Sequence, residues 1–124
     1  MTDSKLLDSS VWLAYFTEGD CKEYIESSTI LLLSAVSIFE IQKKLIQSKL
    51  PKEHIMKCME FVKKKSIVIP VTTEIAESTI SIALENHMPV IDSIIYATGI
   101  LNHADVITLD NDFRGLKHAI VLTK

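Results

Sequence analysis

Short apolar runs alternate with longer helix-like stretches along this chain, and that alternation restricts the fold more than any other feature. The run from Thr29 to Leu33 is β-branched, leucine-rich and apolar on both faces, which is typical of a strand buried in a parallel sheet. Four further strand-like runs are Lys5–Leu7, Ser66–Val71, Val106–Leu109 and Ala119–Leu122. Strands separated by helices predict an α/β domain with a central, mainly parallel sheet.

Helical patterns occupy the intervening segments. They cover Val11–Phe16, Cys21–Glu26, about Ser34–Lys49, Lys52–Lys65, Thr73–Asn86 and about Val90–His103. Leu50-Pro51 ends the third of these, because the residue before a proline disfavours helical geometry. The helix of residues 73–86 is amphipathic, with Ala76, Ile80, Ala83 and Leu84 along one side. With 124 residues and no internal repeat or long linker, residues 1–124 are expected to form a single domain.

The composition favours a soluble cytoplasmic protein. The hydrophobic fraction of 48% is normal for a globular chain, and no apolar stretch approaches the roughly 20 residues of a membrane-spanning helix. Residues 1–5 lack the build of a secretory signal. Two cysteines, Cys21 and Cys58, are too few for a disulfide scaffold and are expected to stay reduced. His54 and Cys58 are four residues apart, but no second pair completes a zinc site.

Four acids stand at element ends or in apolar surroundings. Asp8 and Asp110 each follow a predicted strand, Asp92 opens a helix, and Glu40 lies on the helix after the second strand, with Asp112 close behind Asp110. Ligands of parallel sheets bind beyond the carboxyl ends of the strands, so Asp8 and Asp110 are expected to meet there. Gathered carboxylates repel one another unless a cation lies between them, which predicts a hard divalent metal ion.

Each acid also has a purely structural interpretation, and the sequence leaves these open. Asp8 is a good helix N-cap, Asp92 suits the first turn of a helix dipole, and Asp110 suits a turn. Glu40 shares a polar helix face with Lys43, Lys44 and Gln47, which is either solvated or lines a cleft. A calcium loop after Asp110 is excluded, because Arg114 and Val121 occupy its fifth and twelfth positions.

The lysines are concentrated in one segment. Residues 43–65 contain eight lysines against Glu53 and Glu60, although the whole chain has a net charge of −3. A basic segment beside an acidic cluster fits a surface that contacts phosphates next to a metal site. The alternative is that these lysines only solubilise the outer faces of two helices.

In order and spacing, four motifs together resemble the PIN-domain family. They are Leu7-Asp8-Ser9-Ser10-Val11, Phe39-Glu40-Ile41, Val90-Ile91-Asp92-Ser93-Ile94-Ile95 and Val106-Ile107-Thr108-Leu109-Asp110-Asn111-Asp112-Phe113. The length is like that of the small VapC-type toxins. The resemblance implies a three-layer α/β/α sandwich and a Mg²⁺- or Mn²⁺-dependent endoribonuclease, the toxin of a toxin–antitoxin pair.

By position, the resemblance makes Asp8, Glu40, Asp92 and Asp110 the catalytic, metal-holding acids. It makes Asp112 a weaker fifth ligand, and it places Ser9 and Thr108 at supporting hydroxyl positions. Many relatives carry basic residues in the final motif, where this chain has Leu109 and Asn111. The Lys43–Lys65 segment is therefore a better candidate for RNA contacts than that loop. Within the proposed site, Lys43, Lys44 and Arg114 are expected to hold the RNA backbone.

The resemblance further implies an RNA substrate, a small antitoxin that occupies the acidic cleft, and a homodimer. Two alternatives remain: a catalytically silent PIN-like module that binds protein, and an RNA-binding domain whose acids are caps and surface charges.

Overall fold

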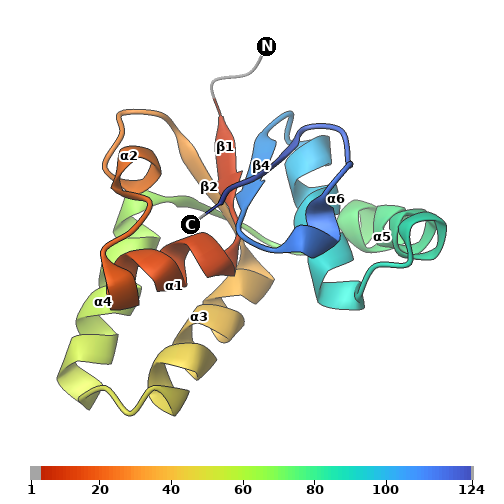
Figure 1. The fold of residues 1–124 in the computed structure, drawn as a ribbon. Coiled ribbons are helices and arrows are strands. Elements are labelled where there is room, and N and C mark those ends of the chain that lie inside the picture. The colour runs from red at the N-terminus through yellow and green to blue at the C-terminus, as the bar shows by residue number, and fades with distance from the viewer. Residues whose placement is uncertain (1–3, 124) are drawn as a thin grey trace.

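The computed structural model describes residues 4–123, in which five strands form one sheet in the order β3-β2-β1-β4-β5 (Figure 1). All four neighbouring pairs are parallel. The strands are β1 (Lys5–Leu7), β2 (Leu31–Ser34), β3 (Ile67–Ile69), β4 (Asp105–Thr108) and β5 (Ala119–Val121). The predicted parallel α/β sheet is thus confirmed, with strand bounds that differ from the predicted ones by a few residues.

The helices follow the predicted order. They are α1 (Ser9–Glu18), α2 (Lys22–Ile25), α3 (Ala35–Gln47), α4 (Lys52–Lys65), α5 (Thr73–Asn86) and α6 (Val90–Leu101), with a short 3-10 turn, η1 (Asn111–Phe113). Helix α1 is longer than predicted at both ends. It stops at Gly19, whose φ of 72° closes the helix in the left-handed conformation that glycine tolerates best. None of the helices within residues 4–123 is both long and apolar enough to cross a membrane.

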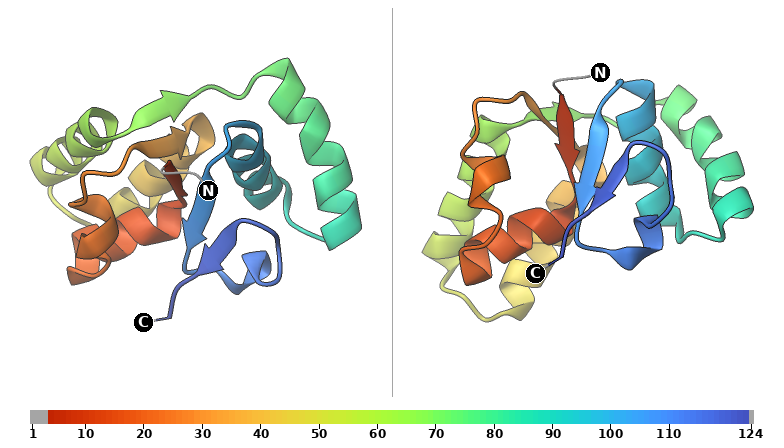
Figure 2. Two further views of the ribbon diagram at one scale, coloured as in Figure 1. Left: turned by 90° about the horizontal axis from the view of Figure 1, so that it is seen from above. Right: turned by 45° about the horizontal axis from the view of Figure 1, so that its top comes forward.

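The sheet separates two apolar cores, and the alternation of side chains along each strand explains the division. Leu7, Leu33 and Ile107 face a core built with α1, α2, α3 and α4. Leu6, Leu32 and Val106 face the opposite core, which α5, α6 and η1 cover. Figure 2 shows α1 and α4 on one side of the sheet and α5 and α6 on the other. This is the three-layer α/β/α arrangement predicted from the sequence.

The apolar side of α5 is not the side that packs. Ile80 and Leu84 are 62% and 72% exposed, whereas Ile75 and Thr79 are buried. The side marked by Ala76, Ile80, Ala83 and Leu84 therefore lies mainly at the surface. Periodicity predicted the helix, and the structure shows that its apolar side is not the side that packs. The reason is that α5 packs on α6 rather than on the sheet, so only a narrow strip of it is covered.

Helix α6 approaches β4 closely at Gly99. A Cβ atom at this position would lie 2.5 Å from Cγ2 of Val106, a fully buried β4 side chain. Valine is restricted at χ1, so that methyl group cannot easily rotate away. The absence of a side chain at Gly99 therefore sets the spacing between α6 and the sheet, and with it the position of the α6 N-terminus.

We expect Gly99→Ala to lower the free energy of unfolding by about 1–3 kcal/mol through overpacking, despite the higher helix propensity of alanine. Urea denaturation followed by circular dichroism measures this. Gly99→Ala should lower the free energy of unfolding by less in a Val106→Ala background than in the wild type, because the shorter side chain leaves space for the new methyl group. A Gly99→Ala variant more stable than the wild type would contradict the close approach.

Candidate metal centre

Four elements deliver acids to the carboxyl edge of the sheet. Asp8 follows β1, Asp110 follows β4, Asp92 lies in the first turn of α6 and Glu40 in the second turn of α3. Each of the four is subject to repulsion from others of the group. The fold thus brings together the acids that the sequence singled out.

The tightest group consists of Asp92, Asp110 and Asp112, each of which has a carboxylate oxygen within 4.8 Å of the other two. Three hard oxygen ligands at this spacing suit a divalent cation such as Mg²⁺ or Mn²⁺. Asp112, predicted to be the weakest ligand, belongs to this group, and Asp8 and Glu40 stand outside it. The structure therefore gives Asp112 more weight than the sequence did.

Asp8 is 4% exposed, and hydroxyl groups of α1 and β4 hold its carboxylate. Its Oδ2 accepts hydrogen bonds from Thr108 Oγ1 at 2.8 Å and Ser10 Oγ at 2.9 Å. The Asp8 side chain makes no capping hydrogen bond to α1, so the N-cap interpretation of its carboxylate is not supported. Burial raises the pKa of Asp8, while the two hydroxyl donors act to lower it.

Ser10 is a supporting residue that the sequence analysis did not select. Its Oγ accepts a hydrogen bond from the backbone N–H of Leu109 at 3.0 Å while donating to Asp8. Thr108 Oγ1 in turn accepts from the backbone N–H of Asp110 at 2.9 Å. The Asp8-Ser9-Ser10 run offers two hydroxyl groups near the acid, but the sequence does not indicate which of them donates a hydrogen bond to Asp8. Ser9 donates to Oε1 of Glu40 instead, at 3.1 Å.

Asp92 is repelled by four neighbouring acids. Burial, followed by the negative charges of Asp110, Asp8, Glu40 and Asp112, raises the pKa of its carboxyl to about 7. An aspartate that is half protonated at neutral pH shows how unfavourable this gathering of acids is without a cation. A divalent ion among these oxygens would remove the repulsion and keep all the acids ionised.

Glu40 faces the acids rather than open solvent. Its pKa is raised by burial and by the charges of Asp8 and Asp110, and lowered by Ser9 and Lys44. Of the two interpretations of its helix face, the structure supports the cleft. Glu40 also lines a hollow of about 340 Å³ together with Lys43, Lys44 and Ile91.

The turn after β4 combines a structural role with its acids. Oδ1 of Asp110 accepts from the N–H of Asp112 at 2.9 Å, as the turn interpretation predicted. Arg114 ends η1 and donates from Nη2 to Oδ1 of Asn111 at 2.7 Å, at the exposed rim of the same turn.

Away from this edge, His54 Nε2 lies 3.8 Å from Cys58 Sγ, and no third metal-ligating side chain joins that pair within residues 4–123.

A family model described as "PIN domain" matches residues 5–119. The chain belongs to the PIN-domain family. Several solved structures share its fold. A toxin–antitoxin complex from Klebsiella pneumoniae aligns with a TM-score of 0.80 and 22% identity over 94% of this chain and 96% of the other.

VapBC2 from Rickettsia felis, bound to a DNA fragment from its promoter, aligns with this PIN domain at a TM-score of 0.75 and 14% identity, covering 96% of this chain and 97% of the other. VapC20 of Mycobacterium tuberculosis is described as a toxin that cleaves the sarcin–ricin loop. It aligns at a TM-score of 0.71 and 15% identity, covering 91% of this chain and 95% of the other. The TM-scores show that these proteins share the fold of this chain. No curated protein matches the sequence.

The acid cluster predicts how the stability of the metal-free protein depends on pH. Because the pKa of Asp92 rises from 3.8 to about 7 on folding, the free energy of unfolding should fall as pH increases through that window. We expect Asp92→Asn to have the higher Tm at pH 8.5, by roughly 3–10 °C, and the difference to shrink at pH 5.5. Thermal melts in EDTA measure this. A difference that does not change with pH would show that Asp92 carries no repelled charge.

The hydroxyl network predicts a coupling between β4 and metal affinity. Thr108→Val removes a donor to Asp8 and an acceptor for Asp110, so it should lower the free energy of unfolding by about 1–3 kcal/mol and weaken Mn²⁺ binding in calorimetry. Thr79→Val is the matched control, because Thr79 is a buried threonine bonded to Ile75 of α5, outside the site. Thr79→Val should lose stability and keep its Mn²⁺ affinity. Equal Mn²⁺ affinity in both variants would show that the hydroxyl network does not support the metal centre.

Proposed function

We propose that this PIN domain is a Mg²⁺- or Mn²⁺-dependent endoribonuclease that hydrolyses RNA phosphodiester bonds. The observation that carries the proposal is the gathering of five acids at one sheet edge, where the pKa of Asp92 reaches about 7. A protein gains nothing in stability from such a cluster by itself. Its presence in a fold shared with toxin proteins supports a site that acts on a phosphate through a metal ion.

The acids divide into holding and orienting groups. Asp92, Asp110 and Asp112 are closest together and would hold the metal ion, with the oxygen of Asp8 that is not bonded to Ser10 and Thr108 as a further ligand. When bound, Mg²⁺ or Mn²⁺ lowers the pKa of a coordinated water and stabilises charge on the phosphoryl oxygens. The same donor set of carboxylates suits both ions.

Glu40 would orient the attacking water. Its Oε1 is fixed by Ser9, and its raised pKa makes it a better proton acceptor than an exposed glutamate. In the proposed reaction one water oxygen bonds to phosphorus and its proton passes to a carboxylate. The bond from phosphorus to the leaving ribose oxygen breaks, and that oxygen is protonated. Acids held rigidly on strand ends keep the water and the phosphate aligned for in-line attack.

The RNA backbone is assigned to the basic groups around the cluster. Lys43 and Lys44 are exposed on α3 beside Glu40, and Arg114 lies at the turn after β4. These side chains contact phosphates rather than bases, so they supply affinity that depends on salt and little sequence selectivity. Selectivity must come from RNA shape and a few base contacts.

We further propose that the protein is the toxin of a toxin–antitoxin pair, that it dimerises, and that it acts in the cytoplasm. The fold shared with the Klebsiella pneumoniae complex and with VapBC2 supports a small protein partner. Such a partner would neutralise the nuclease by covering the acid cluster. Co-expression with the product of an adjacent short reading frame, followed by purification of the complex, tests this part independently.

The nuclease proposal predicts metal-dependent cleavage of structured RNA by the purified protein. Asp92→Asn should reduce the cleavage rate by roughly 100-fold or more, because it weakens the metal centre. Asp105→Asn is the matched control: Asp105 begins β4, at the end of the sheet opposite to the acid cluster, and pairs with Lys5 at 3.2 Å. Its cleavage rate should remain near that of the wild type. Equal rates in wild type and Asp92→Asn would indicate a contaminating nuclease and refute the assignment.

A further inference from the structure

Phe39 is the one aromatic side chain that is exposed within residues 4–123, with 68% of its surface accessible. The other aromatic rings are buried or partly buried. Trp12, Tyr15 and Phe16 of α1 pack with Phe61 of α4 through stacked and edge-on ring contacts. Leaving a phenylalanine in water forgoes the stabilisation that burial provides, so its exposure calls for an explanation at the surface.

The ring lies beside the acid cluster. Phe39 directly precedes Glu40, and the two residues line the same hollow of about 340 Å³ together with Ile91, which precedes Asp92. That volume is at the lower end of the range that encloses small organic ligands. Phe39 also borders a second hollow of about 420 Å³ that extends along α3. Phe39 thus borders two hollows, one of which is also lined by Glu40.

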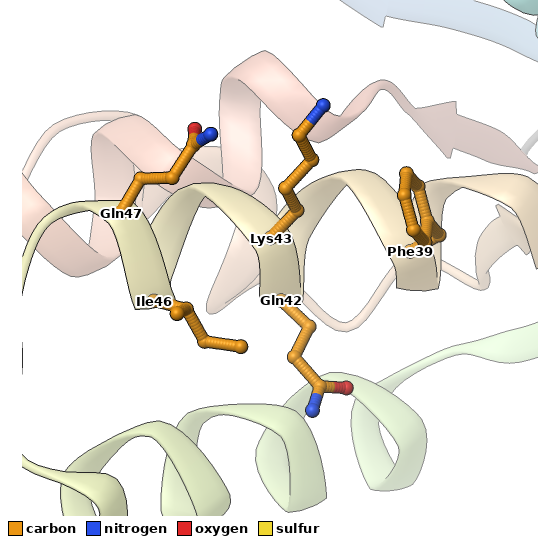
Figure 3. Close-up of a pocket in the computed structure, with 5 residues that line it drawn as sticks. All are labelled: Phe39, Gln42, Lys43, Ile46 and Gln47. Atoms are coloured by element: carbon orange, nitrogen blue, oxygen red, sulfur yellow. The ribbon is translucent and has the colours of Figure 1, made fainter.

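The surroundings of the ring are cationic and polar. Lys43 Nζ lies 5.7 Å from the ring centroid of Phe39, and Lys44 lines the same hollow. Figure 3 shows Phe39, Lys43 and Gln47 on one side of α3, while Gln42 and Ile46 point toward α4. An aromatic face with flanking lysines is the combination by which proteins hold single-stranded nucleic acid.

We propose that Phe39, Lys43 and Lys44 form a nucleotide subsite in which one RNA base stacks on the Phe39 ring and the lysines hold adjacent phosphates. The inference rests on the proposed nuclease function, because the subsite would place the neighbouring phosphodiester toward Glu40 and the metal-holding acids. RNA is favoured over a protein occupant by charge. Lys43, whose Nζ lies over the ring, and Lys44, which lines the same hollow, complement phosphates, whereas a helix packed on Phe39 would have to desolvate them.

The direct test measures base-dependent binding. Fluorescence anisotropy would compare octa-adenylate with an abasic oligoribonucleotide of equal length, using proteins that carry Asp92→Asn so that the RNA stays intact. Phe39→Ala should weaken octa-adenylate binding roughly 5- to 100-fold, because stacking on one aromatic side chain contributes that much. It should leave the abasic probe nearly unaffected. Leu84→Ala removes a similarly exposed apolar side chain from α5 and should change neither affinity.

Two further variants separate stacking from charge. Phe39→Trp should retain base-dependent binding, since the stacking face is preserved. Lys43→Ala should weaken both probes and reduce the slope of log affinity against log salt by about 0.7, whereas Phe39→Ala should leave the slope unchanged. Equal losses on both probes in Phe39→Ala would overturn the stacking role.

Outcomes for other occupants are also distinct. If Phe39→Ala lowers the mass in sedimentation equilibrium and leaves RNA binding intact, the ring is a contact between copies of the chain and the subsite is wrong. If the wild type cleaves RNA but Phe39→Ala binds both probes normally, the nuclease proposal stands and the subsite fails. If no cleavage occurs but binding of octa-adenylate alone is lost, the subsite stands and the nuclease proposal fails.

Discussion

The hydrogen bonds that join the ends of β1 and β4 through Asp8, Ser10 and Thr108 are the interaction on which the site depends. Parallel pairing places Leu7 opposite Ile107, but pairing alone does not prevent two acidic strand ends from separating. The hydroxyl of Thr108 donates to Asp8 and accepts from the backbone of Asp110, and Ser10 makes the equivalent pair of bonds to Asp8 and Leu109. Each hydroxyl thus connects both strand ends, which holds Asp8 and Asp110 close despite their repulsion.

The repulsion that remains falls mainly on Asp92. Two hydroxyl groups donate to Asp8 and one donates to Glu40, which lowers the pKa of those acids. Burial and four neighbouring negative charges raise the pKa of Asp92, and no hydrogen-bond donor within residues 4–123 offsets that rise. Its location in the first turn of α6 supplies only the partial positive charge of a helix N-terminus. The scaffold therefore supports two acids internally and leaves a third to be neutralised from outside. In an otherwise stable fold, this acidic edge is therefore where a bound cation would relieve the most repulsion.

The sequence predicted the parallel sheet and the set of acids because both depend on local signals. A strand that is apolar on both faces and an acid directly after it are visible in a few residues, as at Leu6-Leu7-Asp8. The finer arrangement depends on tertiary contacts. Whether Ser9 or Ser10 donates a hydrogen bond to Asp8 depends on the direction in which α1 leaves the sheet. The closeness of Asp112 to Asp92 and Asp110 depends on the η1 turn. Which side of α5 is covered also depends on tertiary contacts, since packing on α6 buries Ile75 and Thr79.

Helix α3 explains how acidic and basic functions share one short element. Residues three and four apart lie on the same helix face, so Glu40 is followed there by Lys43 and Lys44, and Phe39 is followed by Lys43. The opposite face packs Ile41 and Leu45 into the core, which fixes the rotation of the helix about its axis. Because that rotation turns Glu40 toward the acids, it also determines that the lysines and Phe39 flank the same opening. Because Glu40 and Lys44 share one face, a different rotation of the helix would move both together, so the packing of α3 specifies the acid that faces the cluster and the surrounding surface at once.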